Sequence, residues 1–68
     1  MTVRKFLQMM MVGCSTIDAV HIRVGLDRPY VLSRTDVQKE EYYGFGIDKV
    51  VSFEVHGTTL VLNIQIAR

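Results

Sequence analysis

The sequence has few of the residues that build covalent or metal-held structure. Its 68 residues contain one cysteine, Cys14, and two histidines, His21 and His56. One cysteine excludes a disulfide within the chain, and the set has no zinc-ligand spacing. A lone thiol is typical of a reducing compartment, so we expect a cytoplasmic protein. Small domains without disulfides or metals commonly gain stability from a second subunit, and we therefore expect a homodimer.

A long apolar run and a strong charge of one sign are also missing. No run could span a bilayer, so we expect no membrane partner. Eight basic and seven acidic residues leave a formal charge of +1, too balanced for binding nucleic acid mainly through phosphates. Residues 1–34 nevertheless hold five basic against two acidic residues, and residues 35–68 hold three against five. A small nucleic-acid-binding regulator that uses the basic half is one alternative function, and a structural homo-oligomer is the other.

The opening segment MTVRKFLQMMMVGC fits two descriptions. Its basic start, short apolar run and Gly-Cys resemble a bacterial lipoprotein signal with Cys14 lipidated, but the run is short and Gln8 interrupts it. A helix fits better, because Thr2 is a suitable N-cap and Gly13 a suitable end. We expect this helix and a free thiol at Cys14. The residues at the spacing of one buried face are Val3, Phe6, Leu7 and Met10.

From Asp18 the apolar period changes to two. The alternation of Val20, Ile22 and Val24 predicts a half-buried strand that ends at Gly25. Residues 26–29 form a turn, and a second short strand, 30–33, completes a hairpin. Pro29 cannot donate a ladder hydrogen bond, which places this second strand at an edge.

The last twenty residues predict a second hairpin. A tight turn at His56-Gly57 would pair Phe53 with Leu60, and one at Gly57-Thr58 would pair Phe53 with Leu62. Either turn keeps the two apolar sets on one face, because the registers differ by the side-chain period of two. We expect His56 itself to be a turn residue that tolerates positive φ. The two apolar sets are Val51, Phe53 and Val55, and Leu60, Leu62, Ile64 and Ile66.

Between the hairpins the pattern is weaker. Thr35 and Gln38 have the spacing of a capping box, which predicts a short helix from Asp36 to about Tyr43 with Gly44 as its left-handed C-cap. An ordered loop over residues 36–43 is the alternative. The order of elements is then helix, two strands, short helix or loop, and two strands. This order predicts one α+β domain, residues 1–68, with the N-terminal helix packed on a largely antiparallel four-stranded sheet of unspecified strand order.

We find no set of residues suited to catalysis. Cys14, His21 and His56 fall on a helix end, a strand and a turn, and nothing in the pattern brings a nucleophile to a base. Glu40 and Glu41 are adjacent and point in different directions, which makes them a poor acid and base pair. We therefore expect no enzyme, and no cofactor or metal.

Both ends of the chain resemble small α+β proteins of Gram-positive phages and mobile elements. The segments are TVRKFLQ and VVSFEVHGTTLVLNI, roughly the first ten and last twenty residues. Some proteins of this kind inhibit host defence, including anti-CRISPR proteins that block an effector nuclease. The resemblance implies an anti-defence inhibitor and carries over no catalytic residue. Residues 25–46 match no motif, and we expect partner specificity there.

Aromatic and basic side chains in this middle segment are the predicted contacts. Exposed aromatic residues anchor many protein interfaces. In KEEYYGFG, residues 39–46, we expect one of the two tyrosines to pack inward and the other to stay exposed with Phe45. The predicted function is a non-enzymatic interaction protein that inhibits a host protein by surface binding. The predicted partner-binding residues are Arg28, Tyr30, Arg34, Lys39, Tyr42, Tyr43 and Phe45.

Overall fold

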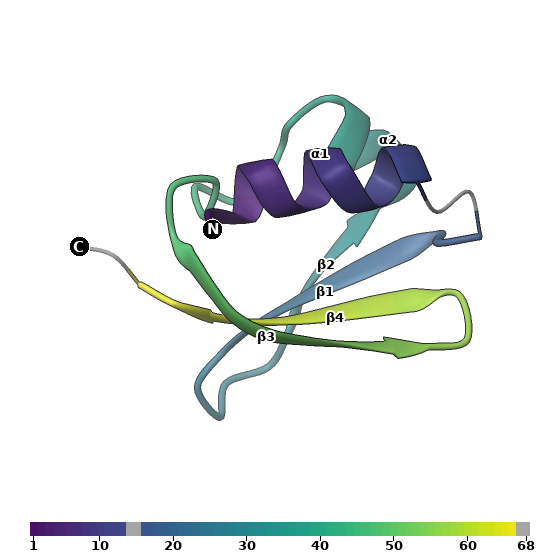
Figure 1. Ribbon diagram of the computed structural model, residues 1–68. Helices are drawn as coiled ribbons and strands as arrows, with labels where there is room; N and C mark the ends of the chain where they lie inside the picture. The colour runs from purple at the N-terminus through teal and green to yellow at the C-terminus, as the bar shows by residue number, and fades with distance from the viewer. Residues whose placement is uncertain (14–15, 67–68) are drawn as a thin grey trace.

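The computed structural model describes residues 1–13 and 16–66 and has the predicted α+β architecture (Figure 1). Helices α1 and α2 lie on one face of a four-stranded sheet. The prediction about Cys14 falls outside the described residues. No helix within the described ranges is long and apolar enough to cross a membrane. The elements are α1 (Val3–Gly13), β1 (Ala19–Val24), β2 (Tyr30–Ser33), α2 (Arg34–Gln38), β3 (Lys49–His56) and β4 (Thr59–Gln65).

The strand order is β2-β1-β4-β3, which the sequence did not specify. Each predicted hairpin forms, with β1 antiparallel to β2 and β3 antiparallel to β4. The hairpins join through β1 and β4, which run parallel. This places β1 and β4 in the middle under the helices, where Val20, Ile22, Leu60 and Leu62 are fully buried. β2 is an edge strand, as Pro29 predicted, and β3 forms the other edge.

Helix α1 begins and ends where the sequence predicted. The Thr2 hydroxyl accepts a hydrogen bond from the Lys5 N–H at 3.3 Å, and the helix ends at Gly13. One detail of the predicted buried face is wrong, because Met11 is buried and Met10 only partly so. The reason is α2, which packs beside α1 and widens the covered stripe toward Met11.

Helix α2 differs from its prediction in cap and length. Its capping box is formed by Ser33 and Asp36 instead of Thr35 and Gln38, and the helix ends at Gln38. Ser33 ends β2 in an extended conformation, so its hydroxyl is already placed to accept from the Asp36 N–H at 3.1 Å. Residues beyond Gln38 form turns, so the expected helix to Tyr43 is wrong. Gly44 has the expected positive φ of 79°, but in one of these turns and not as a helix cap.

The turn between β3 and β4 is Gly57-Thr58, and Phe53 faces Leu62. Gly57 takes the positive φ, 61°, so the expectation that His56 would do so is wrong. His56 is instead the last residue of β3, opposite Thr59. The positive φ at the first turn position matches the twist of the flanking strands, and glycine adopts it without strain.

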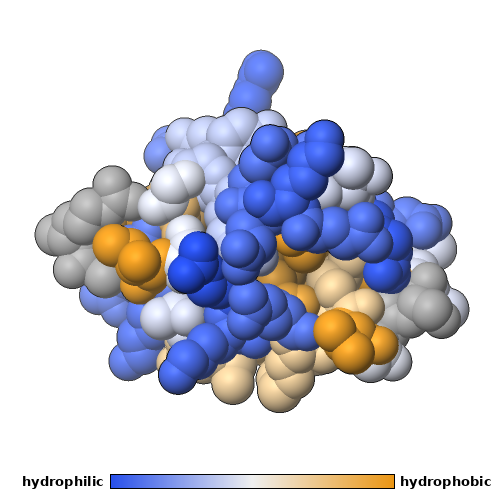
Figure 2. All heavy atoms as spheres, turned by 90° about the horizontal axis from the view of Figure 1, so that it is seen from above, coloured by the Kyte–Doolittle hydropathy of each residue, from blue (hydrophilic) through white to orange (hydrophobic). Residues whose placement is uncertain are grey.

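The helices cover the sheet unevenly. Along the edge strand β3 the apolar side chains of Val51, Phe53 and Val55 are between 48% and 63% exposed. Viewed from the helical side, polar atoms cross the middle of the molecule and apolar atoms are exposed toward the lower right (Figure 2). A register shift between Val50 and Ser52 marks a bulge near the start of this strand. The molecule therefore has one apolar edge.

Candidate protein-binding surface

Three of the predicted contact residues come together as an aromatic cluster, Tyr30, Tyr43 and Phe45. The ring centroids of Tyr30 and Tyr43 are 5.4 Å apart, and those of Tyr30 and Phe45 are 4.9 Å apart. Tyr30 begins β2, whereas Tyr43 and Phe45 belong to the segment between α2 and β3. Tyr43 is 59% exposed and Tyr30 41%, while Phe45 packs partly against the core. The cluster therefore presents two rings to solvent on a third, anchored ring.

Tyr43 holds its ring there in a backbone conformation that tyrosine disfavours. Its φ is 53° and that of Gly44 is 79°, and the Phe45 N–H donates to the Tyr42 carbonyl at 2.9 Å. Two positive φ values in a four-residue turn are typical of Asn-Gly, and a left-handed conformation costs other residues about 1–2 kcal/mol. The Tyr43 hydroxyl donates to the Val31 carbonyl at 3.2 Å, which ties the turn to β2.

An acidic hollow adjoins the cluster. It has a volume of about 290 Å³ and is lined by Leu32, Asp36, Glu41 and Tyr43. The Ser33 N–H donates to the Asp36 carboxylate at 3.0 Å, and chiefly this bond, then the Ser33 hydroxyl, holds the pKa of Asp36 below its ordinary value. Asp36 is therefore negatively charged at neutral pH. The hollow combines a negative charge, an apolar floor and an aromatic wall.

Two further predicted contact residues are engaged inside the molecule. Tyr42 is only 4% exposed, its hydroxyl donates to the Val37 carbonyl at 3.4 Å, and burial, followed by the charge of Glu40, raises its pKa. Tyr42 is thus the inward tyrosine of the pair. The Arg34 guanidinium donates to the carbonyls of Met11 and Ile17, which joins α2 to the last turns of α1 and to the segment before β1.

Arg28 and Lys39 lie outside the cluster. Arg28 is exposed in the turn between β1 and β2. Lys39 is exposed at the C-cap of α2, where its N–H donates to the Thr35 carbonyl at 3.0 Å. No ring contact or ion pair involving either side chain is found in residues 1–13 and 16–66. The structure thus groups the aromatic residues without a basic patch.

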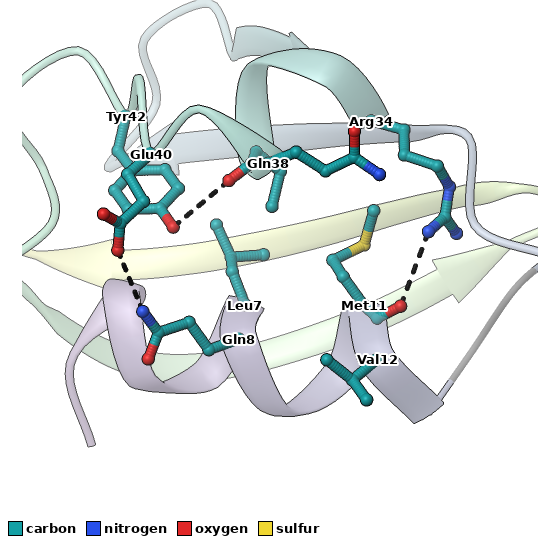
Figure 3. A pocket seen from close by; sticks show the side chains of 9 residues that line it. Leu7, Gln8, Met11, Val12, Arg34, Gln38, Glu40 and Tyr42 are labelled. Atoms are coloured by element: carbon teal, nitrogen blue, oxygen red, sulfur yellow. Dashed lines mark hydrogen bonds between the residues drawn. The ribbon is translucent and has the colours of Figure 1, made fainter.

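A second hollow, of about 300 Å³, lies between α1 and α2 (Figure 3). Leu7 and Met11 point into it, while Gln8 and Glu40 close one end through a hydrogen bond of 2.9 Å. Arg4 adds an ion pair with Glu40 at 3.4 Å. Arg34 spans the other end. These contacts cross-link the two helices, so the hollow is bridged by the protein's own polar side chains.

The two histidines lie apart from both hollows. His21 is half-buried on β1, opposite Val31, on the face of the sheet away from the helices. His56 contacts Glu54 at 2.8 Å at the exposed end of β3. Among residues 1–13 and 16–66, no three His, Cys, Asp or Glu side chains lie close enough to hold a metal ion.

Sequence reasoning missed the exposure of β3. The alternation of Val51, Phe53 and Val55 predicts that they share one face, and this pattern is the same for a covered and an uncovered strand. Phe53 packs against the core residue Phe6, at a ring-centroid distance of 5.0 Å, and is still 48% exposed. Only the position of β3 at the sheet edge could have revealed this surface.

Neither the family models, nor the curated proteins, nor the solved structures with which this chain was compared contain a match to it.

Proposed function

We propose that this protein is a non-enzymatic interaction protein that inhibits a host protein by surface binding in the bacterial cytoplasm. The observation that carries the proposal is Tyr43, an exposed aromatic residue kept at positive φ beside Tyr30. Strained backbone at a surface aromatic residue costs stability, and such positions cluster at binding sites. The resemblance of both chain ends to phage and mobile-element proteins supports an anti-defence target, of the kind that anti-CRISPR inhibitors bind.

The acidic hollow indicates what the partner surface carries. Asp36 and Glu41 would form charge-assisted hydrogen bonds with an arginine or lysine, and the Tyr43 ring offers a cation–π contact beside them. The same two carboxylates oppose a phosphate backbone, which disfavours the nucleic-acid alternative. We therefore propose that a basic side chain of the partner enters the hollow while apolar groups cover Tyr30 and Tyr43.

Capture from a bacterial host lysate tests this function. The tagged protein should retain one host protein, identified by mass spectrometry, and Glu41→Lys should lose it through charge repulsion. Glu54→Lys makes the same charge change on the opposite face of the sheet and should retain it. Tyr43→Asn should also lose the partner, because it removes the exposed ring.

Two results would contradict the proposal. If all variants retain the same protein, the cluster is not the binding surface. If nuclease treatment of the lysate abolishes capture and retention falls steeply with salt, the protein is a nucleic-acid-binding regulator.

We also propose that the protein acts as a homodimer. A chain of this length buries only about 60% of its unfolded surface, and a second copy would cover more of it. The apolar edge at β3 supports this part of the proposal.

A further inference from the structure

The edge strand β3 has an exposed apolar side, and its backbone edge is open from Val51 onward. At its start Lys49 bridges Thr2, and the Val50 N–H donates to the Met1 carbonyl at 3.0 Å. The strand is eight residues long, against four in the opposite edge strand β2. Long edge strands with exposed apolar side chains are templates for pairing with another strand, and proteins usually shorten, charge or cover them. In β3 the only positive charges are those of Lys49 and, when protonated, His56, one at each end.

The ladder shows which backbone groups face outward. His56 and Thr59 flank a two-residue turn, and such flanking residues form a hydrogen-bonded pair. Bonded and non-bonded pairs alternate along an antiparallel ladder, so Phe53 and Val55 belong to non-bonded pairs with Leu62 and Leu60. Their N–H and C=O groups therefore point away from β4, toward the free edge of the sheet.

We propose that two copies of this chain pair β3 with β3, antiparallel, about a two-fold axis at Phe53. The pairing joins two four-stranded sheets into one continuous sheet. Phe53 then lies opposite the second copy's Phe53, and Val55 faces the second copy's Val51, the residue at the bulge. The pairing covers residues 51–55 and ends before Val50, whose N–H donates to the Met1 carbonyl. Because the axis is perpendicular to the sheet, the helices of both copies lie on the same face.

The side chains favour this register over its neighbours. A shift that put Glu54 on the axis would place two carboxylates directly opposite each other, which destabilises a strand pair. With Phe53 on the axis, Glu54 faces Ser52. The contact between Phe6 and Phe53 would extend across the axis into a row of four rings. Cross-strand aromatic pairs of this kind stabilise sheets.

A second copy is the favoured occupant because the edge is complementary to itself. Its apolar side chains meet apolar side chains, its outward N–H groups meet outward carbonyls, and no like charges coincide. The inference rests on the homodimer proposed above and not on the host partner, which would bind at the aromatic cluster. A result that contradicts the β3 dimer would therefore leave the proposed host-partner surface untouched, and the reverse also holds.

Substitutions that place a negative or a positive charge at residue 53 test the proposed register. We expect the wild-type protein to have twice the mass of one chain by sedimentation equilibrium. Phe53→Glu and Phe53→Lys should each halve the mass, because residue 53 would then face its own charge. An equimolar mixture of the two variants should return to the dimer mass, because glutamate then faces lysine.

A second variant leaves Phe53 unchanged, so that loss of the dimer can be separated from misfolding caused by a substitution at that residue. Val55→Pro removes an N–H that the ladder with β4 does not use, and proline is tolerated at sheet edges. We expect Val55→Pro to be folded by circular dichroism and monomeric by sedimentation equilibrium. Val55→Thr keeps the N–H and should remain a dimer. The proposal is overturned if the wild-type protein is a monomer at every concentration, if the mixed variants stay monomeric, or if Val55→Pro remains a folded dimer. The last result would also arise if another strand or helix formed the interface.

Discussion

At the scale of single residues, Tyr43 shows the conflict between local preference and tertiary contact. Its φ of 53° suits asparagine or glycine, yet the chain has a tyrosine there whose ring lies 5.4 Å from that of Tyr30. The ring contact and the hydroxyl bond to Val31 each contribute roughly 0.5–1.5 kcal/mol, which is of the same size as the backbone cost. Tyr43 is therefore close to neutral for folding, and its exposed ring remains available for binding.

Two substitutions separate the backbone cost at residue 43 from the stabilisation by the tyrosine side chain. Tyr43→Ala and Tyr43→Asn both remove the ring contact and the hydroxyl bond, but asparagine tolerates positive φ better than alanine. We expect the asparagine variant to be more stable than the alanine variant by about 1 kcal/mol in urea unfolding. Equal stabilities would show that the turn does not hold residue 43 at positive φ.

At the scale of elements, the capping box decides where α2 lies. Ser33→Ala should lower the free energy of unfolding by about 1 kcal/mol, because the first-turn N–H of Asp36 loses its acceptor. Thr35→Ala is the matched control, since its position matches the capping box that the sequence suggested and the structure does not form. We expect its effect to stay within about 0.5 kcal/mol. A larger loss at Thr35 than at Ser33 would restore the original assignment.

The stability that the Ser33–Asp36 capping box contributes also depends on pH. Hydrogen bonds from Ser33 lower the pKa of Asp36, so the contribution of this carboxylate to stability is complete above the ordinary aspartate pKa. It is lost as the pH falls through the lowered pKa in the folded protein. Titration of the Asp36 carboxyl by NMR should show the lowered pKa in the wild-type protein and a rise toward the ordinary value in Ser33→Ala. An unchanged pKa in the variant would mean that the hydroxyl has no part in the shift.

At the scale of the whole molecule, stability depends on the two central strands. Domains of this length have a total stability of roughly 3–10 kcal/mol. Leu62 is fully buried on β4, and Leu62→Ala should cost about 2–5 kcal/mol, a large share of that total. Val12→Ala also shortens an aliphatic side chain, but Val12 is 88% exposed, so its effect should stay within about 0.5 kcal/mol. Chemical denaturation measures both, and similar losses would contradict the core described above.

The sequence by itself determined the local features of this protein. Period-two alternation located the strands, Thr2 and Gly13 bounded the first helix, and Pro29 marked an edge strand, because each signal depends on neighbouring residues. It also predicted that one of Tyr42 and Tyr43 would be buried. It misplaced the capping box of the second helix, since Ser33 and Thr35 both offer a hydroxyl three residues before a suitable polar side chain.

Only the tertiary structure decided which surfaces stay exposed. The parallel pairing of β1 with β4 fixed β3 at an edge, and this exposed Val51, Phe53 and Val55, whose pattern alone indicated a core. The meeting of Tyr30 with Tyr43 and Phe45 likewise depends on contacts between residues far apart in the chain. Periodicity reports which side chains share a face, whereas burial of that face depends on what the rest of the chain places against it.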